Sequence, residues 1–272
     1  MPLTDLVRYL NVRDRDQRPF LRLDDPFVAT EDGVEAHYAR IRLASHYAPI
    51  YVGGSGSLHG HAAVLGAQGE LNDLPLHPEA VFAIPSSNEE FVHLDRLVRT
   101  LHALNYLLHP AQGHLHLRVN LRHIEIVPGG HGIVFENALR ACGLDPKDIT
   151  LEVHMDGETS AALHKALDAY RKRGYRIALA GVGLGAQDPR LQFFKPDCMR
   201  LDQSLLKQPR RLARVAHGLA DAGIQSLIEV SDAAQAGRAT AAGVTLLQHL
   251  PDKVQRAAAS AHRSDGPHAN LA

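Results

Sequence analysis

The chain has 272 residues, of which 45% are apolar and 22% are charged, and this composition excludes a disordered or fibrous protein. Its 29 Lys and Arg residues nearly balance its 30 Asp and Glu residues, so the formal net charge of -1 gives no electrostatic support for binding nucleic acid or a membrane surface. Cys142 and Cys198 lack the spacing of a disulfide framework or a zinc-thiolate site.

The start of the chain lacks the pattern of a targeting signal. Met1 to Asn11 carry Asp5 and Arg8 among short apolar stretches, and no apolar run reaches the roughly 18 residues of a membrane-spanning helix. We therefore expect a cytoplasmic protein. Residues 1–40 are expected to form a less regular, polar N-terminal extension.

Two β-rich runs and one long helix follow the extension. The runs cover residues 47–52 and 58–65, and the helix is predicted over residues 89–108. Its apolar residues recur at helical spacing on one face: Leu94, Leu97, Val98, Leu101 and Leu104. These elements open a domain that we place at residues 41–253.

From about residue 113 onward, β-rich runs alternate with amphipathic helical patterns, as in βα units that build a parallel sheet. The predicted helices are 161–174, which Gly174 would end, and 211–223. The predicted strands are 114–121, 149–153, 176–180, 198–202, 226–230 and 244–247. With the two earlier runs these make about eight strands, so we predict an α/β fold, a modified TIM-type (β/α)8 barrel. Residues 254–272 are expected to be a flexible C-terminal tail.

Polar residues stand late in four of the otherwise apolar strands. They are Asn120, Glu152, Asp202 and Glu229. Because the carboxyl ends of parallel strands meet at one mouth of a barrel, these side chains are expected to gather there and to form a site. The alternative is that each one only solvates the end of its strand.

Several segments resemble, in order and spacing, those of one protein family. They are Val119-Asn120-Leu121, Leu151-Glu152-Val153, Arg200 to Leu205 and Ile228-Glu229, with weaker similarity at Ala48-Pro49-Ile50, Gly60 to Leu65 and Leu247 to Leu250. This pattern is similar to the EAL domain family over about residues 45–251. The resemblance implies an EAL-like modified barrel, either a cyclic di-GMP phosphodiesterase or a relative that binds the nucleotide or a protein instead.

The resemblance also assigns roles to the polar residues. It makes Asn120 and Glu152 metal ligands and Asp202 a ligand of a second metal. It makes Glu229 a catalytic carboxylate and Gln248 a contact for nucleotide or water. If the nucleotide binds, the same five residues are the candidate contacts.

Other positions depart from the family pattern, and three of them lose acidic ligands. Ala62 stands in place of the name-giving glutamate, and Ala180 and Gly181 stand in place of paired aspartates. Arg200 occupies the position of a catalytic lysine, and Met155 that of a glutamate that braces a loop. A two-metal hydrolase needs carboxylates to hold two divalent cations roughly 3.5–4 Å apart. We therefore expect a degenerate EAL domain with no cofactor, in which Mg or Mn would matter only if residual activity survives.

Arg200 suggests what replaces the metals. It lies two residues from Asp202 on the same side of its strand and keeps its proton at any relevant pH. We expect it to pair with Asp202 or Glu152 and to fill the volume of the metals. The resemblance also places Gly66 and Ala48 where the family contacts the nucleotide, which removes a charge-assisted bond typically worth about 1.5–3 kcal/mol.

The predicted function is therefore that of a catalytically inactive EAL-like signalling protein, not an enzyme, which acts through a protein partner in cyclic di-GMP-related regulation. Two alternatives stay open: a metal-independent cyclic di-GMP receptor, and a weak residual cyclic di-GMP phosphodiesterase that retains Glu229, Arg200 and Gln248. No nucleic acid or membrane partner is expected. A homodimer is left open, because an amphipathic helix indicates a core before it indicates an interface.

Two patterns suggest other chemistry. His59-x-His61 and His114-x-His116 each place two imidazoles on one face of a strand, but a lone pair without a third ligand is more often a packing feature than a zinc site. Gly181-x-Gly183-x-x-Ala186 imitates a dinucleotide-binding loop. The family's glycine-bearing loop accounts for the same glycines, so a nicotinamide oxidoreductase is disfavoured.

Overall fold

The computed structural model describes residues 3–17, 25–109, 113–127, 133–141, 143–155, 160–181 and 189–249. Its helices are α1 (Leu3–Gln17), α2 (Pro78–Phe82), α3 (Asn88–Tyr106), α4 (Leu121–Ile126), α5 (Ile133–Ala141), α6 (Ala161–Lys172), α7 (Pro189–Phe194), α8 (Pro209–Asp221) and α9 (Ala233–Ala241), with short 3-10 helices η1 (Pro146–Asp148) and η2 (Gln203–Lys207). Its strands are β1 (Phe27–Ala29), β2 (Val34–Tyr38), β3 (Ile41–Val52), β4 (Leu58–Gly69), β5 (His114–Val119), β6 (Ile149–His154), β7 (Arg176–Ala180), β8 (Cys198–Leu201), β9 (Gln225–Val230) and β10 (Leu246–His249).

Strands β3 to β10 close into an eight-stranded barrel. The sheet order runs from β3 through β10, β9, β8, β7, β6 and β5 to β4, and a further pairing of β3 with β4 closes the ring. Strands β4 to β10 are parallel to one another, whereas β3 is antiparallel to both of its barrel neighbours. The predicted modified barrel is confirmed, and the reversed first strand is its modification.

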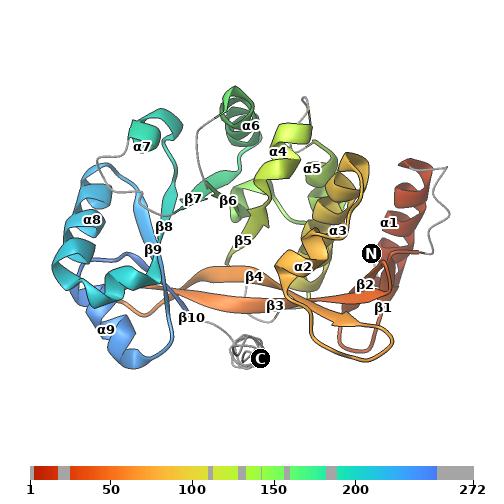
Figure 1. Cartoon of the computed structure of the whole chain (residues 1–272), viewed down its shortest axis with the longest axis horizontal. Helices are drawn as coiled ribbons and strands as arrows, with labels where there is room; N and C mark the ends of the chain where they lie inside the picture. Colours follow the sequence, from red (N-terminus) through yellow and green to blue (C-terminus); the bar gives the residue numbers. More distant parts are fainter. Residues whose placement is uncertain are drawn as a thin grey trace, which may run out of the picture.

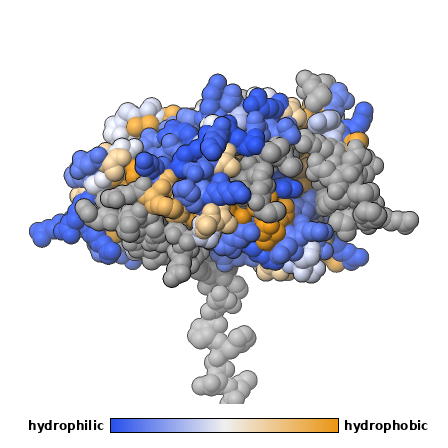
Figure 2. Space-filling view, turned by 90° about the horizontal axis from the view of Figure 1, so that it is seen from above, coloured by the Kyte–Doolittle hydropathy of each residue, from blue (hydrophilic) through white to orange (hydrophobic). Residues whose placement is uncertain are grey.

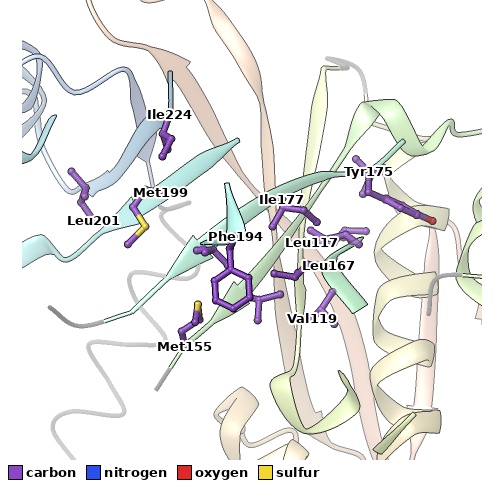
Figure 3. Close-up of a cluster of buried hydrophobic side chains, with 14 of the residues drawn as sticks. Leu117, Val119, Met155, Leu167, Tyr175, Ile177, Phe194, Met199, Leu201 and Ile224 are labelled. Carbon is purple, nitrogen blue, oxygen red and sulfur yellow. The ribbon is translucent and has the colours of Figure 1, made fainter. Parts of the chain in front are cut away.

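The main hydrophobic core lies between the barrel strands and the helices outside them. Alternate residues of a strand face opposite sides, so Leu117 and Val119 of β5 point to the helices while their neighbours face the barrel interior. Figure 3 shows this cluster, with the ring of Phe194 near Leu167 and Ile177. These side chains fix the positions of the strand ends.

The barrel interior holds a separate cluster of mostly small buried side chains. Ala48, Ile50, Ala62, Ala178, Cys198, Leu227 and Leu246 form it. Burial raises the pKa of the Cys198 thiol to about 12, so this cysteine is a packed, unreactive thiol. The interior is therefore a packed core below a polar upper layer.

The antiparallel ribbon of β3 and β4 extends beyond the barrel and carries a second structural unit (Figure 1). Near residues 41–43 its edge pairs with β2, which pairs in turn with β1. We call β1, β2, α1 and the adjoining part of the ribbon the annex. Its core combines Leu6 and Leu10 of α1 with Leu43 of β3 and Leu101 of α3.

Asparagine side chains tie the helices to the annex strands. Asn11 of α1 accepts a hydrogen bond from the backbone N–H of Phe27 (3.0 Å) and donates one to its carbonyl (2.9 Å). Asn105 of α3 makes the same double contact with the backbone of Val34, at 2.9 and 2.8 Å. Each amide therefore satisfies both polar groups of a strand residue, which buried backbone requires.

Residues 1–40, expected to be a less regular polar extension, contain the regular elements α1, β1 and β2. The apolar residues of these short elements face ribbon and α3 residues that are far away in the sequence, so no local pattern marks them. The domain boundary at residue 40 stays a prediction. The expected tail, residues 254–272, lies outside the described residues.

Two reciprocal hydrogen bonds between side chains and backbone N–H groups cap the N-terminus of helix α3. Ser87 Oγ accepts a hydrogen bond from the backbone N–H of Glu90 (3.2 Å), while Glu90 Oε2 accepts one from the backbone N–H of Ser86 (2.7 Å). Such reciprocal bonds satisfy the free N–H groups of a helix start. These hydrogen bonds fix the start of a helix that lines a cavity at the carboxyl ends of the barrel strands.

Among the described residues, no helix is long and apolar enough to cross a membrane. The face of the molecule in Figure 2 is mainly hydrophilic, with small apolar areas near its middle.

Barrel closure depends on a glycine where β4 meets β5. A Cβ atom at Gly60 would clash with the carbonyl oxygen of His114, its partner in register. We predict that Gly60→Ala lowers the free energy of unfolding by about 1–3 kcal/mol, because overpacking against backbone cannot relax. The matched change Gly237→Ala on α9, where a Cβ meets no atom within 4 Å, should raise it by roughly 0.5–1 kcal/mol. Urea denaturation measures both, and equal effects would contradict the prediction.

Candidate functional site

A cavity of about 460 Å³ opens at the carboxyl ends of the barrel strands, between the barrel and helices α2 and α3. Five of the six polar residues singled out in the sequence line it: Asn120, Glu152, Arg200, Glu229 and Gln248. They come from β6, β8, β9 and β10 and from the residue that follows β5. The mouth of the barrel therefore does bring these distant residues together, as the strand-end pattern predicts.

Arg200 and Glu152 form an ion pair across the mouth. Arg200 Nε and Nη2 both lie 2.8 Å from Glu152 Oε2, and Nη2 also donates to Gln248 Oε1 at 2.8 Å. His154 Nε2 lies 2.9 Å from Glu152 Oε1. Since an ionised carboxylate only accepts hydrogen bonds, this histidine nitrogen is the donor. Both oxygens of Glu152 are thus engaged by side chains of the protein.

Although the pair is buried, each of its charges stabilises the ionised form of the other. Burial alone would raise the pKa of Glu152, but the charge of Arg200 and the hydrogen bonds from His154 and Arg200 hold this pKa well below its usual range. Burial likewise opposes the charge of Arg200, yet Glu152 raises the pKa of the guanidinium. Both groups are therefore charged at neutral pH, and each neutralises the other.

Asp202 does not join the cavity. It follows β8, is exposed, and caps η2 by accepting a hydrogen bond from the backbone N–H of Ser204 at 2.8 Å. Of the two carboxylates expected to pair with Arg200, the structure therefore selects Glu152. Glu229 accepts a hydrogen bond from Gln203 Nε2 at 2.6 Å, and burial raises its pKa.

Asn120 is held in place by a buried ionic network that the sequence did not reveal. Its own side chain caps α4, and its backbone N–H donates to Asp95 Oδ1 of α3 at 3.3 Å. Asp95 Oδ2 lies 2.6 Å from Arg99 Nη2 and 3.1 Å from His123 Nδ1. The Arg99 guanidinium also stacks over the Phe135 ring, 4.7 Å from its centroid. This network fixes α3 to the start of α4 beneath the cavity.

Several positions where the family resemblance leads one to expect polar or charged residues carry none of these groups. Ala62 lines the cavity with a methyl group, and Ala180 is a buried residue at the end of β7. Met155 packs in the hydrophobic core, where Figure 3 shows it near Phe194. A Cβ at Gly66 would clash with the His46 ring, so no longer side chain fits there without movement of His46.

This donor set does not fit a pair of divalent cations. A cation at Glu152 would have to displace Arg200 and His154 from its oxygens. Within the described ranges, no group of three His, Cys, Asp or Glu side chains is arranged to hold a metal ion. Hard divalent cations require several free oxygen ligands, and the mouth offers a guanidinium in their place.

The histidine pairs lie at the barrel wall in two different environments. His59 and His114 stack with ring centroids 4.9 Å apart, and His61 faces outward to Tyr106, whose hydroxyl lies 3.3 Å from His61 Nδ1. His116 is 3% exposed and lines the cavity, and burial lowers its pKa to about 3. The glycines of the dinucleotide-like loop after Gly181 lie outside the described residues.

In the sequence, His116 stands out only as one of a histidine pair, and His154 lies two residues after Glu152, from where it could reach the mouth. The polar cavity residues that sequence reasoning does not single out are His77, Glu79, Asp95, His102 and Arg118. His116 and Arg118 precede Asn120 by four and two positions in the chain, and His154 follows Glu152 by two. The alternation of strand side chains places all three on the inner face with the recognised residues, so this period was a usable signal. Asp95 lies in the predicted helix 89–108, where the alternation of strand side chains does not apply, so nothing in the sequence indicated that it faces the cavity.

The fold and site together define an α/β barrel with a polar cavity at the carboxyl ends of its strands. The EAL domain family model matches residues 34–248. The chain therefore belongs to the EAL domain family.

Solved structures share this fold at low sequence identity. The calcium and cyclic diGMP complex of Klebsiella pneumoniae BlrP1 is 20% identical with a TM-score of 0.63, over 76% of this chain and 54% of that chain. The c-di-GMP complex of the PaMucR phosphodiesterase is 17% identical with a TM-score of 0.64, over 78% of this chain and 99% of that chain. BlrP1 with FMN and cyclic diGMP but no metal ions is 19% identical with a TM-score of 0.59, over 76% of this chain and 52% of that chain.

The match thus spans about half of the Klebsiella chain. No curated protein sequence matches this chain.

The ion pair at the mouth should behave as one unit in folding. We predict that Glu152→Gln or Arg200→Met alone lowers the free energy of unfolding by about 3–5 kcal/mol, because each leaves the other charge buried and unpaired. The double variant should be much less destabilised than the sum of the two. A double-mutant cycle by urea denaturation measures the coupling. Asp5→Asn, which removes an exposed partner of Arg8, is the control and should change the free energy of unfolding by at most about 1 kcal/mol. If the effect of the double variant equalled the sum of the two single effects, the coupling would be contradicted.

Buried His116 should make stability depend on pH. Its folded pKa of about 3 lies below the value of about 6.5 in an unfolded chain, so below about pH 6.5 the unfolded state binds a proton that the folded state excludes. Stability therefore falls as pH drops. His116→Leu should remove about 2 kcal/mol of that fall between about pH 7 and about pH 5. As a control, the stability of the His116→Leu variant should depend on pH in the same way as that of the wild type between about pH 7.5 and about pH 9. If the stability of variant and wild type fell equally steeply between about pH 7 and about pH 5, the assignment to His116 would be contradicted.

Proposed function

We propose that this chain is a catalytically silent EAL domain that acts in cyclic di-GMP-related regulation through a protein partner. The observation that carries the proposal is the ion pair of Arg200 with Glu152, which puts a fixed cation of the protein among the residues that resemble metal ligands. The guanidinium neutralises the surviving carboxylate as the metals would, but it cannot generate hydroxide from water.

The chemistry of phosphodiester hydrolysis explains why this exchange silences the site. Two-metal hydrolysis lowers the pKa of a bound water and clamps the attacking and leaving oxygens. Arg200 keeps its protons and Gln248 is neutral, so neither can act as general base. Glu229 is available as a carboxylate, but a single base without metals supplies only a small part of the required rate enhancement.

A protein partner is supported by apolar side chains that the described surface leaves open. Leu71 is 84% exposed and Leu74 59% exposed, in the segment that leads from β4 to the cavity helix α2. Exposed clusters of large apolar side chains commonly mark contact surfaces.

A second candidate, a metal-independent cyclic di-GMP receptor, is favoured by the cavity itself. The mouth retains Asn120, Gln248 and a volume of about 460 Å³. BlrP1, with which the chain shares its fold, is known with cyclic diGMP and no metal ions. The positions Gly66 and Ala48 lack the polar groups that the family resemblance expects there, which weighs against tight binding.

Hydrolysis assays test the main proposal. Purified protein with excess Mg or Mn should form no linear product from cyclic di-GMP, while the PaMucR phosphodiesterase serves as the positive control under the same conditions. Titration with Mn should show no stoichiometric binding. Product formation by the wild-type chain that is lost in Glu229→Ala would overturn the proposal.

Calorimetric titration with cyclic di-GMP in the presence of a chelator separates the two candidates. Stoichiometric binding that is weakened by Gln248→Ala supports the receptor. Absence of heat with a correctly folded sample supports a regulator that acts by protein contact alone.

A further inference from the structure

The cavity contains a cation that the ion pair does not use. Arg118 of β5 lines the cavity and is exposed. Arg118 is the register partner of Glu152 in the neighbouring strand. Within the part of the chain that the structure describes, Arg118 nevertheless forms no ion pair or hydrogen bond with Glu152, whose two oxygens contact Arg200 and His154. Among the described residues, none forms a hydrogen bond or ion pair with the Arg118 guanidinium, so its donors face the cavity.

Beside it lies a buried histidine whose ring nitrogens have no partner. His116 is two residues before Arg118, so both side chains lie on the inner face of β5. It is 3% exposed, and neither Nδ1 nor Nε2 forms a hydrogen bond with any residue that the structure describes. Burial keeps the ring neutral, so it offers one N–H donor and one acceptor. A buried polar group without a partner is costly, and a ligand that accepts from this ring would remove that cost.

Apolar side chains also line the cavity. Val64 and Leu65 belong to β4, the strand that pairs with β5, and Phe82 and Val98 belong to α2 and α3. The polar residues of the α2 and α3 side are His77, Glu79, Asp95 and His102. A cavity of this size with apolar side chains and a few convergent polar groups is typical of small-molecule sites. An inorganic anion alone would leave most of the 460 Å³ without contacts.

We infer that the mouth binds an amphipathic organic anion, with its carboxylate or phosphate on Arg118 and His116 and its apolar body against the side chains of Val64, Leu65, Phe82 and Val98. This inference rests on the proposed function, because it requires that Arg200 and not a metal holds Glu152.

Two of the carboxylates around the cavity are neutralised by arginines, Asp95 by Arg99 and Glu152 by Arg200. Glu229 accepts a hydrogen bond from the neutral amide of Gln203, and Glu79 lies on the exposed rim. Among the described residues that line the cavity, Arg118 is the guanidinium that no carboxylate pairs with, so it can give a charge-assisted, bidentate hydrogen bond to an acid group.

The test is calorimetric titration of the full chain, in a buffer with chelator, with three probes that share one tail: octanoate, n-octyl phosphate and 1-octanol. At least one anion should bind with one-to-one stoichiometry, and octanol should bind at least about tenfold more weakly. Preference for octanoate or for octyl phosphate identifies the acid group. Octanol binding as tightly as both anions, or no binding of either anion, overturns the inference.

Variants locate the acid group. Arg118→Gln should weaken binding of the anion by about tenfold or more and leave that of octanol unchanged. His116→Leu should also weaken binding of the anion. Arg210→Gln on α8, an exposed arginine outside the cavity, is the matched control and should bind like wild type. Wild-type affinity in both cavity variants overturns the inference, and circular dichroism verifies that each variant is folded.

The hydrolysis assay on the same sample keeps the two proposals separate. Product from cyclic di-GMP with Mn refutes the silent domain. Absence of both product and anion binding refutes only the anion site.

Discussion

A positive charge buried in the barrel mouth must be neutralised, and much of the upper barrel is arranged around this need. Arg200 reaches across from β8 to Glu152 on β6 and to Gln248 on β10, so one guanidinium joins three strands. Desolvation would make either charge unfavourable by itself, whereas together they keep each other ionised. His154 donates to the other oxygen of the same carboxylate, and the neighbouring Arg118 faces the cavity.

The barrel could be predicted from the sequence because its signals are local. Strands and helices after residue 113 alternate with clear periods, and the three predicted helices lie within about two residues of the observed α3, α6 and α8. The annex could not be predicted in the same way. The three-residue strand β1 and the helix α1 take their stability from the ribbon and from α3, so their own residues show no pattern that would mark them.

The candidate site was predictable in its position but only in part in its contacts. Asn120, Glu152, Glu229 and Gln248 reach the mouth because parallel strands end together there. Asp202 stands at the same level of its strand, but it lies one residue beyond β8 and turns to cap η2. The choice between a cap and a cavity contact depends on the turn that follows the strand, which strand periodicity does not encode.

Helix α3 belongs to two cores at once. Leu94, Leu97 and Leu101 pack into the annex, while Asp95, Val98 and His102 of the same helix border the cavity. Its carboxylate Asp95 further holds the backbone of Asn120. The annex and the mouth therefore share one structural element: the leucines that anchor α3 in the annex also fix where its polar residues stand in the cavity wall.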